Sequence, residues 1–106
     1  NQVVVAGTNT DGSPFLGFVD KLGVAYSDPV ICTGYGAYIA MPLLRKINDS
    51  HPEGLDKETA KKAVNDALRV LYYRDGRSLN RYEMADVTAA GITVSEPYTL
   101  DTTWDI

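Results

Sequence analysis

The chain has 106 residues, of which 44% are hydrophobic and 23% charged, the balance of a globular chain of one domain or less. Its net charge of −4 argues against nucleic acid or an anionic membrane as a partner. No apolar run approaches the ~20 residues of a membrane helix. The single cysteine, Cys32, excludes an internal disulfide and is typical of a reducing compartment.

The first residues, 1–5, have neither a basic lead nor a long apolar run, so we expect no signal peptide. The chain has no initiating Met and opens directly into an apolar run. This opening predicts that an upstream segment has been lost.

The first third of the chain is expected to form four short strands. Residues 3–6 are an apolar, largely β-branched run, and residues 15–19 follow a turn at 9–12, so the two runs predict a hairpin. Residues 24–26 continue the meander after Gly23. Beyond Pro29, residues 30–33 are interpreted as a fourth strand.

Two helices are expected next. Residues 37–47 place Ile39, Leu43 and Ile47 on one helical face, and Pro42 predicts either a kink or a start nearer Met41.

After a loop at 48–55, Asp56 is a good N-cap for a helix that runs to about Arg74, and Gly76 is placed to end it. Residues 82–88 and 92–95 then predict a second hairpin with Gly91 in its turn. An irregular tail, residues 96–106, closes the chain.

The predicted order is therefore ββββ-αα-ββ, an α+β arrangement. The strand at 15–19 is apolar on both of its faces, which indicates burial on both faces. Two helices joined by a short loop are expected to lie together on one side of a sheet, so they can cover only one face. A second layer is needed for the other face; the alternative is that the helices straddle the sheet.

The residues alone offer no complete catalytic constellation. His51 is the only histidine and is interpreted as a solvated loop residue, which gives little support to a metal site or a triad. Cys32 is interpreted as a small core residue. No base is visible that would activate Ser78, which follows the long helix together with Arg74 and Asp75.

Several segments, spread over nearly the whole chain, resemble the C-terminal half of proteasome beta subunits, and a non-catalytic member in particular. The tyrosine pair before Arg74 and the ending Trp-Asp-Ile are the most specific of them. The resembling segments are residues 15–26, 33–38, 42–45, 69–75 and 103–106.

The resemblance implies one half of a four-layer αββα sandwich, the N-terminal nucleophile hydrolase fold. It implies that residues 1–95 are the C-terminal half of the domain and residues 96–106 a tail that contacts another subunit through Tyr98 and Trp104. A tail folded on its own domain is the alternative. Family members usually continue beyond Ile106.

In catalytic members the nucleophile is an N-terminal threonine, which would belong to the half absent here. Supporting groups are a serine between two glycines, where this chain has Tyr35 between Gly34 and Gly36, and an Arg-Asp-x-x-Ser element. The family-matched structural residues are Gly34, Gly36, Arg74, Asp75 and Ser78, and the glycine pair usual after that serine is replaced by Leu79 and Asn80.

The resemblance thus implies a non-catalytic structural subunit of the 20S proteasome core, without cofactor or metal, located in the cytoplasm and nucleus. Its expected partners are the other proteasome alpha and beta subunits, within the beta ring and across the ring–ring interface. Neighbouring subunits would carry out ATP- and ubiquitin-dependent protein degradation. Two alternatives stay open: an active threonine-type endopeptidase subunit, and a stand-alone α/β interaction module.

Overall fold

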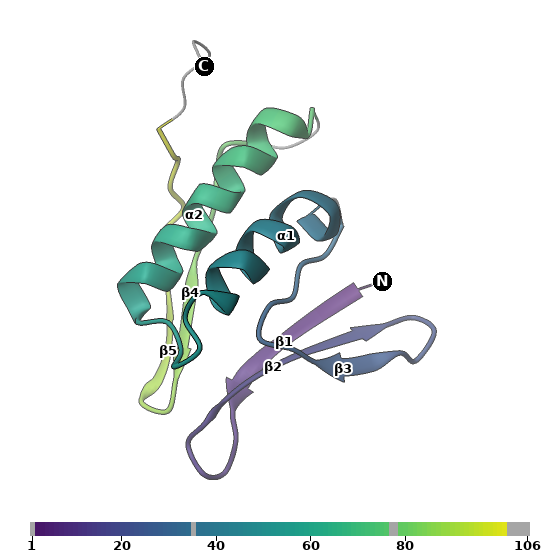
Figure 1. Cartoon of the computed structure of the whole chain (residues 1–106), viewed down its shortest axis with the longest axis vertical. Helices are drawn as coiled ribbons and strands as arrows, with labels where there is room; N and C mark the ends of the chain where they lie inside the picture. The colour runs from purple at the N-terminus through teal and green to yellow at the C-terminus, as the bar shows by residue number, and fades with distance from the viewer. Residues whose placement is uncertain (1, 35, 77–78, 102–106) are drawn as a thin grey trace.

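The computed structural model describes residues 2–34, 36–76 and 79–101 (Figure 1). Its strands pair as two antiparallel sheets, with orders β1-β2-β3 and β4-β5, and the helix pair lies between them in the chain. The expected α+β class is confirmed. The elements are β1 (Gln2–Thr8), β2 (Pro14–Asp20), β3 (Ala25–Ser27), α1 (Gly36–Asp49), α2 (Lys57–Arg74), β4 (Ala85–Thr88) and β5 (Gly91–Val94).

The β1–β2 hairpin is closed by a polar turn. The backbone N–H of Asn9 donates to the Ser13 carbonyl at 2.8 Å, and Gly12 takes the positive φ of 87° that the turn requires. The Asp11 carboxylate accepts hydrogen bonds from the Ser13 hydroxyl at 2.6 Å and the Ser13 N–H at 2.9 Å. These hydrogen bonds hold the pKa of Asp11 below its usual value.

The two faces of the three-stranded sheet are fixed by the register, which pairs Val3 with Val19 and Val4 with Phe18. Because successive residues of a strand point to opposite faces, Leu16 and Phe18 share one face. That face meets the helices: Leu16 lines a cavity of about 200 Å³ together with residues of both helices, including Leu44 of α1 and Ala60, Ala63 and Val64 of α2.

The opposite face of this sheet, here called the outward face, carries Val3, Val5, Phe15 and Val19. Both helices lie to the other side of the hairpin (Figure 1). On the helix-facing side Phe18 is 8% exposed, although Val4 beside it on β1 is 42% exposed, and on the outward face Val3 is 51% exposed. Apart from Phe18, the buried apolar side chains among the described residues are Val30, Ala40 and Ala67, so the core is thin.

The fourth strand expected at residues 30–33 is absent, and the observed order is βββ-αα-ββ. Pro29 has no N–H to give to a ladder, and the Val30 N–H donates instead to the Asp28 carboxylate at 3.1 Å. These local bonds take the chain out of the sheet and leave Val30 buried.

Helix α1 begins at Gly36 and continues through Pro42, so the alternative start near Met41 is wrong. Helix α2 has the expected N-cap, because the Asp56 carboxylate accepts the Thr59 N–H at 2.7 Å. Its C-cap is Asp75 in an extended conformation, with its N–H donating to the Leu71 carbonyl at 2.8 Å. Gly76 has no positive φ and is not the glycine cap that was expected.

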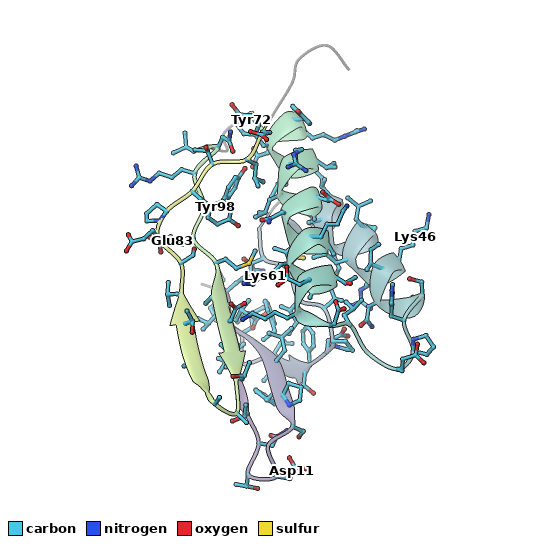
Figure 2. All side chains as sticks on the ribbon, turned by 90° about the vertical axis from the view of Figure 1, so that its left-hand side faces the viewer. Asp11, Lys46, Lys61, Tyr72, Glu83 and Tyr98 are labelled. Carbon is cyan, nitrogen blue, oxygen red and sulfur yellow. The ribbon has the colours of Figure 1, made fainter. Side chains whose placement is uncertain are left out.

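The second hairpin is confirmed, with Val87 paired to Ile92, although its first strand begins at Ala85 instead of residue 82. Gly91 is not in the turn, as was expected, but is the first residue of β5 and follows the turn at 89–90. Two lysines of α2 hold it to the helix: Lys61 Nζ lies 3.0 Å, and Lys57 Nζ 3.5 Å, from an Asp86 carboxylate oxygen. Figure 2 shows Lys61 between α2 and the hairpin. Its hydrogen bond and the nearby positive charges lower the pKa of Asp86.

Candidate functional site

The glycine element before α1 is a packing element. Gly34 has a φ of 61°, in the left-handed region, and its N–H donates to the Gln2 side-chain oxygen at 3.1 Å. Gly36 is buried, and a Cβ built there would lie 3.4 Å from the Cys32 Cβ. Gly34 lets the chain turn from the sheet into α1, and Gly36 packs beside Cys32 as the first residue of the helix. Tyr35 lies outside the described residues.

The Arg-Asp element lies at the end of α2. Arg74 is the last helical residue and is exposed, and Asp75 is the half-buried C-cap. Ser78 lies outside the described residues, so its predicted relation to Asp75 stays a prediction. The first turn of α1 and the last turn of α2 lie at the same end of the helix pair (Figure 1), which brings the two family-matched elements to one end of the fold.

Two residues with nucleophile or base chemistry lie elsewhere. His51 is half-buried, and its Nδ1 is 2.9 Å from the Ile47 carbonyl and 3.0 Å from the Ser50 hydroxyl, so it is not the solvated loop residue that was expected. It closes the C-terminal end of α1. Cys32 is half-buried, and burial raises the pKa of its thiol, which keeps it protonated at neutral pH.

The described part of the tail, residues 96–101, folds back on its own domain. Tyr98 and Tyr82 exchange two backbone hydrogen bonds of 2.8 Å each, and the Tyr98 hydroxyl donates to the Asn65 side-chain oxygen at 2.7 Å. Tyr98 is half-buried there, close to α2 (Figure 2). The predicted contacts of Tyr98 and Trp104 with another subunit stay predictions, and Trp104 lies outside the described residues.

Further residues that hold the tail were not singled out from the sequence. Arg69 Nε donates to the Asp101 carbonyl at 2.8 Å, and the Asn80 amide bonds to both the N–H and the carbonyl of Leu100. One signal was present for Asn65: asparagine is a poor helix former, and its place inside α2 indicates a use for its side chain. The partners of Asn80 lie twenty residues further along the chain, where no local pattern points to them.

The outward face is the second candidate site. Val5 is 45%, Phe15 40% and Val19 42% exposed on neighbouring strands, and Gly17 lies under the Phe15 ring. A contiguous apolar surface of this kind is typical of a protein contact. Ser27 of β3, which pairs with Gly17, brings one hydroxyl to this face beside the apolar side chains, and the apolar majority favours a second apolar layer.

Within ranges 2–34, 36–76 and 79–101, no cluster of His, Cys, Asp or Glu side chains has the arrangement of a metal site. None of the helices described there is long and apolar enough to cross a bilayer.

A family model and several relatives indicate the same protein family. The family model "Proteasome subunit" matches residues 1–87. Proteasome subunit beta type-4 of Xenopus laevis is 49% identical over 106 residues, which is all of this chain and 43% of that protein. The beta type-4 subunit of Dictyostelium discoideum is 46% identical over 102 residues, 96% of this chain and 39% of that protein.

Proteasome subunit beta type-7 of Saccharomyces cerevisiae is 46% identical over 88 residues, 80% of this chain and 33% of that protein. The chain spans about two fifths of the length of the two beta type-4 relatives. The expected resemblance to proteasome beta subunits is confirmed, and the chain belongs to the proteasome subunit family.

Proposed function

We propose that the chain is part of a non-catalytic beta subunit of the 20S proteasome core. In this role it supports assembly of the ring, and neighbouring subunits carry out ATP- and ubiquitin-dependent protein degradation. The whole-chain similarity to subunits named beta type-4 supports this proposal.

The outward face is the observation that carries the proposal. Its valine and phenylalanine side chains are about half exposed, although strand residues of this kind are ordinarily buried. Burial of apolar surface contributes roughly 25 cal/mol per Å² to stability, so a second layer over this face is strongly favoured. The part of the relatives that this chain does not span is long enough to contain that layer. We therefore propose that the three-stranded sheet is an inner layer of a sandwich and that the chain is not a stand-alone module.

The non-catalytic role is supported by the residues at the helix-pair end. Gly34 is used for a turn and Gly36 is buried beside Cys32. Tyr35 stands between them in the sequence, where the resemblance places a serine in catalytic members. Asp75 caps α2. We propose that these residues, with Arg74 and Ser78, support the fold.

The proposed partners are the other alpha and beta subunits of the core, and the proposed location is the cytoplasm and nucleus. The proposed subunit uses no metal ion or nucleotide of its own.

A labelling experiment tests assembly and catalysis together. A tagged full-length subunit containing this chain is expressed in its own cells, core particles are purified through the tag, and an electrophile that traps N-terminal threonine nucleophiles is added. Intact-mass measurement is expected to show catalytic neighbours labelled and this subunit unlabelled. A labelled subunit would establish the active threonine peptidase instead, and a tag that never enters core-sized particles would refute the structural role.

A further inference from the structure

The cavity of about 200 Å³ between the helices and the sheet is here called the helix-pair cavity. It is lined by β2, by the segment after β3, by the C-terminal half of α1 and by the N-terminal half of α2. All but one of the described residues that line it are apolar, and none of them is charged. The exception is Asn48, in the last turn of α1.

Polar contacts around the helix-pair cavity hold its walls in place. One oxygen of the Asp28 carboxylate accepts the Val30 N–H at 3.1 Å, and the other lies 3.4 Å from Nη2 of Arg45 on α1. At the C-terminal end of α1, Nδ1 of His51 lies 2.9 Å from the Ile47 carbonyl oxygen. A cavity persists where its surroundings collapse only partially into it, and these contacts oppose such a collapse.

The second layer proposed for the outward face would not fill the helix-pair cavity. Leu16 lines the cavity from the helix-facing side of β2, so the sheet itself stands between the cavity and the outward face. On the opposite wall, Ala60 and Ala63 of α2 have short side chains that leave the space open. Ala60 also lines a second hollow beside the β4–β5 hairpin, so Ala63 is the better position at which to fill the cavity.

The size and the lining of the cavity indicate the chemical class of its ligand. An apolar cavity of roughly 150 Å³ is large enough to hold a benzene ring. Small-molecule sites are mostly apolar, with a few polar groups that fix the orientation of the ligand. The side-chain amide of Asn48 offers both a donor and an acceptor. The apolar walls therefore fit one aromatic ring, and Asn48 fits one polar substituent on it.

We infer that the helix-pair cavity is a binding site for a small aromatic molecule that carries one hydroxyl or N–H group, and that Asn48 orients this group. The ligand contacts β2 and both helices at once. Because it binds only the folded arrangement, it stabilises the packing of the helix pair on the sheet. The site lies within this chain, so the inference does not depend on the proposed role in the proteasome core.

The test uses the full-length subunit containing this chain, purified in the assembly that it forms in its own cells. The probes are phenol and benzene, which differ by the hydroxyl group. Hydrogen exchange followed by mass spectrometry is measured while each probe is titrated. Both probes are expected to slow exchange in peptides covering residues 44–55 and 60–64 about 5-fold at saturation, and to leave the β4–β5 hairpin unchanged.

Two variants and a control examine the cavity and its polar residue separately. Ala63→Leu places apolar atoms in the open space, so it is expected to weaken both probes about 10-fold or more and to raise the melting temperature by about 3 °C. Asn48→Leu removes one hydrogen bond, so it is expected to weaken phenol about 5-fold and to leave benzene unchanged. The matched control Ala37→Leu adds the same side chain to the exposed first turn of α1 and is expected to change neither probe.

The absence of protection by either probe would overturn the site, because the space would then be filled by another part of the subunit. Unchanged probe binding in Ala63→Leu would also overturn it, since the probes would then bind elsewhere. Equal effects of Asn48→Leu on phenol and benzene would overturn the role of Asn48 and the polar group of the ligand. If Ala63→Leu does not fold, the probe titrations of the unmodified subunit and of Asn48→Leu still decide the inference.

Discussion

The two faces of the β1–β2–β3 sheet have similar apolar side chains and different surroundings. On the helix-facing side, Phe18 is packed against Tyr26, with ring centroids 5.1 Å apart, and is almost completely covered, although Val4 and Tyr26 beside it are 42% and 44% exposed. On the outward face, Val5 and Phe15 are 45% and 40% exposed. The contrast is clearest on the central strand, where Phe18 is 8% and its neighbour Val19 is 42% exposed, and it comes from the cover that the helices give to one side of that strand.

The helix pair can cover one face of the sheet and cannot cover the other. Two antiparallel helices supply one layer, which buries one side of a sheet. A sheet with apolar residues on both sides needs a layer on each. Four measurements can show whether a second layer covers the outward face and how the helices and the tail are held.

A charge on the outward face gives the largest expected effect. In the full-length subunit, Val5→Asp is expected to lower the free energy of unfolding by about 4 kcal/mol, because a covered face would bury an unpaired carboxylate. Urea unfolding monitored by circular dichroism measures the change. The control Thr10→Asp places the same charge in the exposed hairpin turn and is expected to change stability by less than about 0.5 kcal/mol. If both variants behave alike, the outward face lies in water.

A pair of phenylalanine truncations compares the two faces directly. Phe18→Ala is expected to cost about 3 kcal/mol, since it removes a buried ring and leaves a cavity below the helices. Phe15→Ala is expected to cost nearly as much in the full-length subunit if a second layer covers it. A loss of about 1 kcal/mol or less for Phe15→Ala in the same unfolding assay would mean that only the helix-facing side is covered.

Asn65 of α2 supports the tail through a hydrogen bond and not through apolar packing. Tyr98→Phe removes only the hydroxyl that bonds to Asn65, so the expected loss is about 1 kcal/mol of local stability, confined to the tail. Hydrogen exchange of the Tyr98 amide measures it, and Tyr26→Phe on β3 is the control. Equal exchange in the two variants would show that Asn65 does not hold the tail.

The smallest expected effect concerns the start of α2 and depends on pH. Hydrogen bonds from Thr59 hold the pKa of Asp56 below its usual value, so the unfolded chain binds this proton more readily than the folded one. The stabilisation is complete above the ordinary pKa of about 4 and is lost as the pH falls through the lower folded pKa.

Melting temperatures between pH 6 and pH 3 test this effect against the Asp56→Asn variant, which caps a helix without titrating. The unmodified subunit is expected to lose about 3 °C more than the variant over this range. Parallel curves would show that the cap does not contribute through its charge.

The parts of the fold that follow from local chemistry were predictable. The Asp56 cap and the glycine turn at Gly12 depend on neighbours in the sequence, and both are confirmed. The strand expected after Pro29 was wrong, because the Asp28 side chain competes for the Val30 N–H and a pattern of apolar residues does not show that competition.

The candidate site was predictable only in part. The resemblance drew attention to Gly34, Gly36 and Asp75, and the structure gives the two glycines a turn and a packing role and Asp75 the helix cap. The hydrogen bonds that hold the tail were missed, because the partner of Asn80 depends on the path of the chain between residues 80 and 100. Such long-range pairings follow from the tertiary fold and not from the spacing of residue types.

The turn between β1 and β2 has a further consequence for folding. A slip of one residue between two strands normally moves apolar side chains into water, which penalises the wrong alignment. In this hairpin, a slip of one residue would replace one set of apolar side chains by another on each face. Exposure of apolar side chains to water therefore does little to penalise a wrong alignment. The Asn9–Ser13 turn must therefore fix the alignment of the two strands. Weakening its hydrogen bonds is expected to favour misaligned, aggregating chains before it lowers the stability of the fold.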